Sequence, residues 1–309
     1  MEAARHERRI FELGSEIFDL MESARPRPWQ RTWWQERAMR ILDRDQRLRT
    51  RVFQFVDCLP ALGSAEDIAD HLRAYLDDPA LTLPTALRSW LRPGPAYRWR
   101  AEWIGRFARF AALEMAGRFI TGHDVPSALR TVERLRRDGL AFTLDVLGES
   151  TTSDRAADRY AAVYHDLMDR LPPIARSWAE VPLIDRSRRG PMPRVNFSLK
   201  LTGLDPFFDP IDPDRAVREV GARLRPLFRH ARETGAFVNI DMESTRYRVL
   251  TLELFRRLMM EDEFRDWEHV GIVLQAYLKD AEHDLRELLE WARRRGCPFT
   301  VRLVKGAYW

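Results

Sequence analysis

The sequence predicts an α/β protein: a (β/α)8 TIM-like barrel that is truncated after its fifth strand and preceded by an all-α N-terminal arm. Apolar residues recur at helical spacing over residues 1–140. From residue 141 onward, short β-rich runs alternate with long amphipathic stretches, which is typical of a parallel sheet. The first of these runs is not followed by a glycine-rich phosphate loop. We therefore expect two domains, a helical arm at 1–140 and an incomplete barrel at 141–309.

The composition excludes several classes of protein. The 309 residues are 45% hydrophobic and 32% charged, which is unlike a low-complexity or disordered chain. No apolar run approaches the roughly 18 residues of a membrane-spanning helix, and the N-terminus has mixed charges in place of a signal peptide, so a cytoplasmic location is expected. Cys58 and Cys297 lie far apart and the histidines are scattered, so no metal site is predicted.

The charge of the chain does not indicate a nucleic-acid partner. The net charge is +4, and the 51 basic residues are interleaved with 47 acidic ones. All but three of the basic residues are arginines, the exceptions being Lys200, Lys279 and Lys305. This pattern is typical of a solvated, arginine-rich surface.

The arm is predicted to be a series of helices punctuated by prolines. Apolar residues recur at helical spacing within 11–21, 39–42 and 52–56. Asp124 is expected to cap a helix over residues 125–137, because its side chain can accept hydrogen bonds from backbone N–H groups of the first turn. Six tryptophans are expected to anchor helix packing, namely Trp29, Trp33, Trp34, Trp90, Trp99 and Trp103.

The barrel portion contains five predicted strands. They lie at 142–147, 195–199, 237–240, 270–274 and 299–304. Helices are expected between them at 156–171, 214–234, 247–260 and 281–295, with an irregular insertion at 172–194. Five β/α units fit either a doubly wound sheet or a barrel, and the missing phosphate loop favours the barrel. A strand that runs directly into Tyr308 and Trp309 also suggests an interrupted barrel, so we expect the chain to be the N-terminal piece of a longer protein.

Polar side chains follow or end every predicted strand. They are Asp145, Glu149, Lys200, Asp241, Glu243, Gln275, Arg302 and Lys305. The carboxyl ends of parallel barrel strands meet at one mouth, and charges placed there are costly unless they meet one another, water or a ligand. The pattern therefore predicts an enzyme site. Structural roles stay open: Asp145 could tie down backbone, Lys200 and Asp241 could form a buried ion pair, and Gln275 could satisfy barrel backbone.

Two other functions are compatible with these residues. A strand-end lysine, Lys200 or Lys305, could be desolvated and form a Schiff base with a carbonyl substrate. Alternatively, residues 1–140 could be a helical interaction module attached to a decayed, non-catalytic barrel. The intact strand-end residues argue against decay.

The segment Val301–Trp309, with the sequence VRLVKGAYW, resembles the fifth-strand motif of proline dehydrogenases. Four further segments resemble the other strand ends of that family, namely 144–149, 198–201, 239–243 and 274–277. The helical portion is similar to the arm of bifunctional PutA-type enzymes, in which a glutamate-semialdehyde dehydrogenase domain follows the barrel. The resemblance thus covers essentially the whole chain and is most specific over 141–309.

The resemblance implies a barrel that holds FAD at its mouth and oxidises L-proline to Δ1-pyrroline-5-carboxylate. Hydride would pass to FAD and electrons would pass on to membrane quinone, so peripheral association with the inner face of the cell membrane and a homo-oligomer are both compatible. By position, Arg302 would stabilise the reduced flavin and Gln275 would hydrogen-bond its ring system. Val304, Lys305 and Gly306 would contact the cofactor.

The resemblance also implies substrate-binding residues. Lys200 would hold the proline carboxylate, and Asp241 would orient the site beside Lys200 and the flavin. Tyr308 would pack on the substrate ring, and Glu149 would belong to the gate above it. The family's adjacent arginines on the last barrel helix, and its binding residues for the FAD adenosine and phosphates, have no counterpart in this sequence. We therefore expect the 309-residue chain alone to bind FAD weakly and not to turn over.

Overall fold

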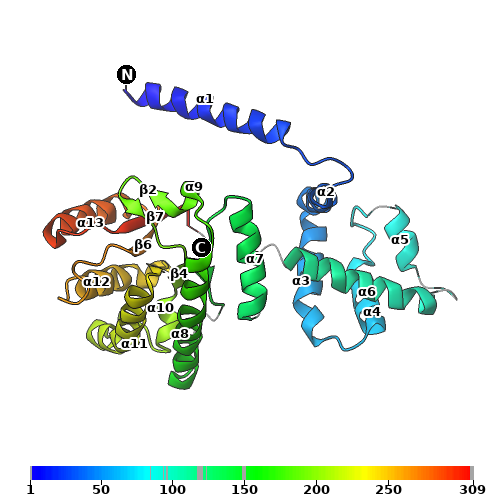
Figure 1. Cartoon of the computed structure of the whole chain (residues 1–309). Coiled ribbons are helices and arrows are strands. Elements are labelled where there is room, and N and C mark those ends of the chain that lie inside the picture. The colour runs from blue at the N-terminus through cyan, green and yellow to red at the C-terminus, as the bar shows by residue number, and fades with distance from the viewer. Residues whose placement is uncertain are drawn as a thin grey trace. The chain divides into compact units, whose positions relative to one another are not determined.

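The computed structural model of the chain describes residues 2–83, 85–92, 94, 97–116, 121–122, 124–147 and 151–306 (Figure 1). The chain divides into two compact units, Met1–Ile120 and Thr121–Trp309. This division falls earlier than the boundary expected after residue 140, because the helix at Val125–Arg137 belongs to the second unit. No helix in the described part of the chain combines the length and apolar composition needed to cross a bilayer.

The first unit is helical. Its elements are α1 (Glu2–Ser23), α2 (Arg31–Arg44), α3 (Gln46–Cys58), the short 3₁₀ helix η1 (Leu59–Ala61), α4 (Ala65–Leu76), α5 (Thr85–Leu91) and α6 (Tyr97–Ala116). Helix α4 begins with a reciprocal capping box between Ser64 and Asp67, which satisfies backbone N–H groups of its first turn. Helices α4 and α6 approach closely, because a Cβ atom on Gly105 would lie 1.8 Å from the carbonyl oxygen of Ala65.

The expected role of the tryptophans in helix packing is wrong for most of them. Within this unit the side chains of Trp29, Trp34, Trp90, Trp99 and Trp103 are all more than half exposed. Helix α6 shows the physical reason. It buries Ala101, Ile104 and Ala108 toward α4, and helical spacing then places Trp99 and Trp103 on the outer face.

The second unit is an α/β layer structure. Its elements are α7 (Val125–Arg137), β1 (Leu144–Asp145), α8 (Asp154–Ser177), α9 (Pro182–Asp185), β2 (Arg186–Ser187), β3 (Gly190–Pro191), β4 (Asn196–Leu199), α10 (Leu201–Leu204), α11 (Pro213–Thr234), β5 (Phe237–Ile240), η2 (Thr245–Tyr247), α12 (Arg248–Leu258), β6 (Val270–Gln275), α13 (Ala281–Arg295) and β7 (Thr300–Val304). The predicted helix at 125–137 is confirmed, with Asp124 accepting from Ser127 N as its N-cap.

Strand order distinguishes the two architectures that the sequence allowed. The five-stranded sheet runs β1-β4-β5-β6-β7, and every neighbouring pair is parallel. Spatial order therefore follows chain order without reversal, as in consecutive barrel strands. A doubly wound sheet reverses direction at a switch point. The predicted α/β class with barrel-type strands behind a helical N-terminal region is confirmed.

The two faces of the sheet differ in chemistry. One face presents Phe197, Leu199, Val238, Ile240 and Ile272, which are fully buried in the core that the sheet shares with its helices. The residues between them along each strand point to the opposite face, because side chains alternate along a strand. Register places Asp145, Ser198, Asn239 and Gly271 in one row across that face, and Val273 beside Arg302 in another. Hence the face away from the helices is the polar one.

The segment expected to be an irregular insertion at 172–194 is partly regular. Helix α8 continues through Pro172 and Pro173 to Ser177, because Leu171, Pro172 and Ala175 complete its buried face. Arg194 donates to the carbonyl oxygens of Ala175 (2.9 Å) and Trp178 (2.6 Å), which satisfies acceptors at the helix end. After it come α9 and the β2–β3 hairpin.

Candidate functional site

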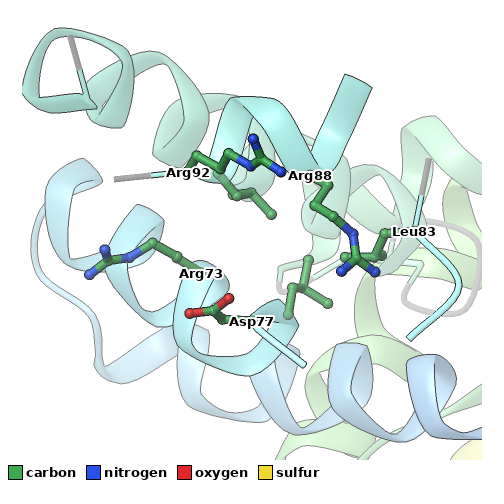
Figure 2. A pocket seen from close by; sticks show the side chains of 7 residues that line it. Arg73, Asp77, Leu83, Arg88 and Arg92 are labelled. Atoms are coloured by element: carbon green, nitrogen blue, oxygen red, sulfur yellow. The ribbon is translucent and has the colours of Figure 1, made fainter. Parts of the chain in front are cut away.

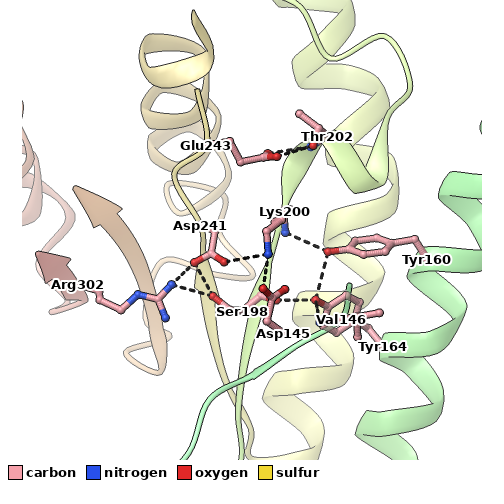
Figure 3. Close-up of polar contacts among 10 residues, drawn as sticks. All are labelled: Asp145, Val146, Tyr160, Tyr164, Ser198, Lys200, Thr202, Asp241, Glu243 and Arg302. Atoms are coloured by element: carbon pink, nitrogen blue, oxygen red, sulfur yellow. Dashed lines mark hydrogen bonds and ion pairs between the residues drawn. The ribbon is translucent and has the colours of Figure 1, made fainter. Parts of the chain in front are cut away.

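Four charged side chains from four strands converge at the carboxyl edge of the sheet, on its polar face (Figure 3). Asp145 is the last residue of β1, Lys200 follows β4, Asp241 follows β5, and Arg302 lies within β7. Lys200 Nζ donates to Asp145 and lies 3.7 Å from Asp241 Oδ2. Arg302 Nη2 donates to Asp241 Oδ1. The charges alternate along this line of contacts, so each cation is balanced by a neighbouring carboxylate.

Ser198 completes the cluster. Its hydroxyl donates to Asp241 Oδ1 over 2.6 Å and accepts from Arg302 Nη2 at 3.1 Å. Ser198 and Lys200 are two residues apart, so both side chains reach the same face of the strand. Asp241 is thereby held by one hydroxyl and one guanidinium while it faces the ammonium of Lys200.

Lys200 is a charged amine in this arrangement. Its side chain is only 7% exposed. Burial alone would lower the pKa of the Lys200 ammonium, but the hydrogen bond to Asp145 and the charges of Asp145 and Asp241 outweigh it, so the pKa lies above its usual value. A Schiff-base lysine needs a lowered pKa, so this environment argues against Lys200 as a carbonyl-trapping nucleophile.

A second polar group lies beside the cluster. Glu243 is buried and accepts from Thr202 N (3.2 Å) and Thr202 Oγ1 (2.5 Å). Gln275, at the end of β6, donates through Nε2 to the carbonyl oxygen of Glu243 over 3.0 Å. Its other amide atom, Oε1, is buried and has no hydrogen-bond partner among the described residues. A buried acceptor of this kind can receive a hydrogen bond from an N–H or O–H group of an ordered water or of a ligand.

Backbone hydrogen bonds and a glycine determine the conformation at the end of β7. Ala276 N donates to Val304 O (2.7 Å), and Tyr277 N donates to Lys305 O (2.9 Å), which ties the end of β7 to the segment after β6. Gly306 has φ +118°, and a Cβ atom there would lie 1.9 Å from the ring of Tyr277. Only glycine fits this position without strain. Lys305 itself is exposed.

The structure thus brings Lys200, Asp241 and Arg302 together, and places Gln275 nearby through Glu243. Two residues of the predicted site, Glu149 and Tyr308, lie outside the described residues. Lys200 and Asp241 form an ion pair, and Asp145 shares it.

Sequence reasoning did not assign four residues that hold this site. They are Tyr160, Tyr164, Ser198 and Thr202. The period of two on β4 could have flagged Ser198 together with Lys200. The tyrosines lie one helical turn apart on the buried face of α8, where a hydroxyl needs a partner.

Two cavities offer alternative sites. A cavity of about 520 Å³ lies on the polar face toward the amino ends of the strands, lined by Asn196, Asn239 and Arg302 among others, and it does not include Lys200 or Asp241. Within the described residues, no group of three or more His, Cys, Asp or Glu side chains could hold a metal ion.

The second cavity, of about 210 Å³, lies in the helical unit beside Arg73, Asp77, Arg88 and Arg92 (Figure 2). Arg88 donates to Leu81 O over 2.7 Å, and the guanidinium groups of Arg73 and Arg88 point in different directions. This cavity does not form a convergent anion site.

Comparison with protein families identifies two regions. The model of the family described as proline dehydrogenase matches residues 128–309. The model described as the proline utilization A N-terminal domain matches residues 7–119.

Individual relatives agree with these matches. The chain is 29% identical over 195 residues to bifunctional protein PutA of Escherichia coli (strain K12), covering 63% of this chain and 14% of that protein. It is 32% identical over 195 residues to proline dehydrogenase 1 of Bacillus subtilis (strain 168), covering 62% of this chain and 52% of that protein. The chain therefore spans about half or less of the length of these relatives.

A solved structure resembles both units. The crystal structure of PutA from Bdellovibrio bacteriovorus inactivated by N-propargylglycine superposes with a TM-score of 0.81 at 36% identity. The match covers 97% of this chain and 29% of that one.

Proposed function

The chain belongs to the proline dehydrogenase family, and we propose that the protein that carries it oxidises L-proline to Δ1-pyrroline-5-carboxylate, with FAD as hydride acceptor and a membrane quinone as the onward electron acceptor. The observation that supports this most is the convergence of Lys200, Asp241 and Arg302 beside the orphaned Gln275 Oε1. These groups offer a cation for a carboxylate, a fixed positive charge and an unsatisfied acceptor on one face of one sheet edge.

The residues at the ends of β6 and β7 fit a flavin. Gln275 Oε1 is a buried acceptor without a described partner, which suits an N–H group of an isoalloxazine ring. Gly306, which packs on the ring of Tyr277, would contact the cofactor through its backbone, with Val304 and Lys305 beside it. FAD, when bound, would supply the two-electron chemistry that protein side chains lack. Arg302 would contribute a permanent positive charge where negative charge develops.

Lys200 would hold the substrate carboxylate. Because its ammonium already contacts Asp145 and Asp241, an incoming carboxylate must share it with both of them. The substrate thereby enters a site whose charges are balanced, and Asp241 keeps Lys200 and Arg302 in place during binding. Tyr308 would pack on the pyrrolidine ring, and Glu149 would belong to the gate.

We also propose the domain roles and the cellular setting. Residues 1–140 would form the arm of a PutA-type bifunctional enzyme and residues 141–309 the first part of its barrel, in a cytoplasmic protein that meets the membrane peripherally. The match of the N-terminal model to 7–119 supports the first assignment.

The test is the activity of the full gene product. Purified with FAD, it should form Δ1-pyrroline-5-carboxylate from L-proline, with loss of the flavin's visible absorbance under anaerobic conditions. The methyl ester of L-proline lacks the carboxylate and should react poorly. A flavin-loaded protein that leaves L-proline unchanged would refute the proposed activity.

A further inference from the structure

Two tyrosines of α8 lie beside the charged cluster, on the side of Lys200 and Asp145 (Figure 3). Tyr160 and Tyr164 are separated by one helical turn, and the two residues are 5% and 0% exposed. Their hydroxyl oxygens are 3.2 Å apart. Tyr164 also contacts Ser198 O over 2.5 Å and Val146 N over 3.1 Å, and Tyr160 contacts Lys200 N at 3.3 Å.

The backbone partners determine which atom donates in each hydrogen bond of the two tyrosine hydroxyls. A carbonyl oxygen can only accept and a backbone N–H can only donate. Tyr164 must therefore donate its single proton to Ser198 O, and it accepts from Val146 N. Tyr160, which accepts from Lys200 N, is left to donate to Tyr164. Burial raises the pKa of both phenols, so they remain neutral donors.

The hydrogen bonds through the two hydroxyls begin and end on the same short backbone segment, Ser198–Lys200. They start at the N–H of Lys200 and end at the carbonyl of Ser198. The side chains of those two residues contact the carboxylates, Ser198 at Asp241 and Lys200 at both Asp145 and Asp241. Fixing this backbone therefore fixes where the hydroxyl and the ammonium stand.

Tyr164 also contacts the backbone of two neighbouring strands. Strand β1 pairs with β4 only at Leu144 and Asp145. At the next residue the hydroxyl of Tyr164 takes the N–H of Val146, while it also occupies the carbonyl of Ser198. It bridges the two strands where their pairing ends, next to the point at which Asp145 meets Lys200.

A packing role alone would not need the hydroxyls. The ring of Tyr160 lies against the backbone of α10, since a Cβ atom on Gly203 would approach the ring to 2.6 Å. A phenylalanine ring would fill the same space. The buried hydroxyls are what distinguish positioning from packing.

We propose that Tyr160 and Tyr164 are positioning residues of this site, whose hydroxyls hold the Ser198–Lys200 backbone so that the Lys200 ammonium stands between Asp145 and Asp241 to receive the substrate carboxylate. That Lys200 receives the substrate carboxylate rests on the proposed function. The positioning of Lys200 by the two hydroxyls is independent of the proposed function.

The chain offers a direct reporter. It has three lysines, and all three lie in the unit Thr121–Trp309. Isotope labelling of lysine therefore gives three side-chain resonances, of which Lys200 is the buried one. Removal of either hydroxyl, in Tyr160→Phe or Tyr164→Phe, should shift the Lys200 side-chain resonance and its titration, and leave Lys279 and Lys305 at their wild-type positions.

Tyr97→Phe is the matched control. It removes a hydroxyl that donates to Asp70 over 2.9 Å in the other unit, so all three lysine resonances should stay in place. Tyr160→Phe removes one backbone contact and Tyr164→Phe removes two, so the former keeps the test decisive if the latter fails to fold. A folded Tyr160→Phe chain whose Lys200 resonance and titration match wild type would overturn the proposal.

The link to substrate is tested separately in the full gene product. There Tyr160→Phe should raise KM for L-proline about fivefold and change kcat by less than about twofold, because it loosens a binding group and not the reacting atoms. An unchanged KM would overturn the substrate clause. A wild-type product that does not oxidise L-proline would refute the proposed function, while the lysine resonances would still decide the positioning role.

Discussion

Replacing Asp241 by asparagine should destabilise the unit Thr121–Trp309, and the size of the effect follows from its contacts. The carboxylate accepts from Ser198 Oγ and Arg302 Nη2 through the same oxygen, Oδ1, while Oδ2 faces Lys200 Nζ at 3.7 Å. Asparagine keeps the shape and an acceptor for Ser198. It removes the negative charge that both cations face.

The expected loss in the free energy of unfolding lies between the values measured for exposed and for buried ion pairs. Two unit charges about 4 Å apart near a protein surface attract by about 4 kcal/mol before desolvation is counted. Breaking a buried pair costs about 3–5 kcal/mol, and an exposed pair contributes less than about 1 kcal/mol. Arg302 is 36% exposed, so water replaces part of its partner, and Lys200 keeps Asp145. We expect Asp241→Asn to lower the free energy of unfolding by about 2 kcal/mol.

The assay is urea unfolding followed by the lysine resonances, which report the second unit alone. Asp209→Asn is the matched control, because Asp209 pairs with the more exposed Arg246 at the surface. It should change the free energy of unfolding by less than about 1 kcal/mol. If Asp241→Asn were no more destabilising than Asp209→Asn, the charge balance described for the cluster would be wrong.

Three further predictions concern other parts of the same unit. Gly306→Ala should destabilise it by about 1–3 kcal/mol in urea unfolding, because an L-residue at φ +118° is strained and its Cβ meets Tyr277; a wild-type midpoint would contradict that geometry. His165 and His230 share a hydrogen bond between their Nδ1 atoms at 2.9 Å, and burial together with the charge of His230 lowers the pKa of His165 below 6.5. The pair should therefore contribute fully to the free energy of unfolding above about pH 6.5, and this contribution of about 1 kcal/mol should be lost as the pH falls through the lowered pKa of His165. His165→Gln should abolish this pH dependence. If the free energy of unfolding had the same slope against pH in the variant and the wild type, the prediction would be refuted. Arg302→Ala in the full gene product should slow flavin reduction about 10²–10³-fold with little change in the affinity for L-proline, and a pure affinity effect in stopped-flow measurements would count against its proposed role.

Much of the fold could be predicted from periodicity. Helix α13 was expected at 281–295 and begins and ends there, and α11 differs from its expected start by one residue. Strong amphipathic patterns and terminal glycines define such helices. Strand β1 was expected at 142–147 but spans only Leu144–Asp145. At its carboxyl end the N–H of Val146 donates to the hydroxyl of Tyr164, a contact that a local pattern does not contain.

The charged residues of the site could be predicted from the sequence, but their hydrogen-bond and ion-pair partners could not. Strand-end positions place Lys200, Asp241 and Arg302 at one edge of a parallel sheet, whatever the loops do. That Asp145 is the direct partner of Lys200, and that Ser198 joins Asp241 to Arg302, depends on side-chain reach and register across the sheet. Neither is visible in one strand taken alone.

Single-turnover flavin reduction by L-proline, measured in the full gene product and in its Lys200→Ala variant, tests the proposed activity and the role of Lys200 together. In the wild type, we expect reduction that saturates with L-proline. In the variant, half-saturation should need about 10–100 times more L-proline, because a charge-assisted contact to the carboxylate is lost, while the limiting rate stays close to wild type. An unchanged half-saturation concentration would show that Lys200 does not hold the substrate, and no reduction at all in the wild type would contradict the proposed activity.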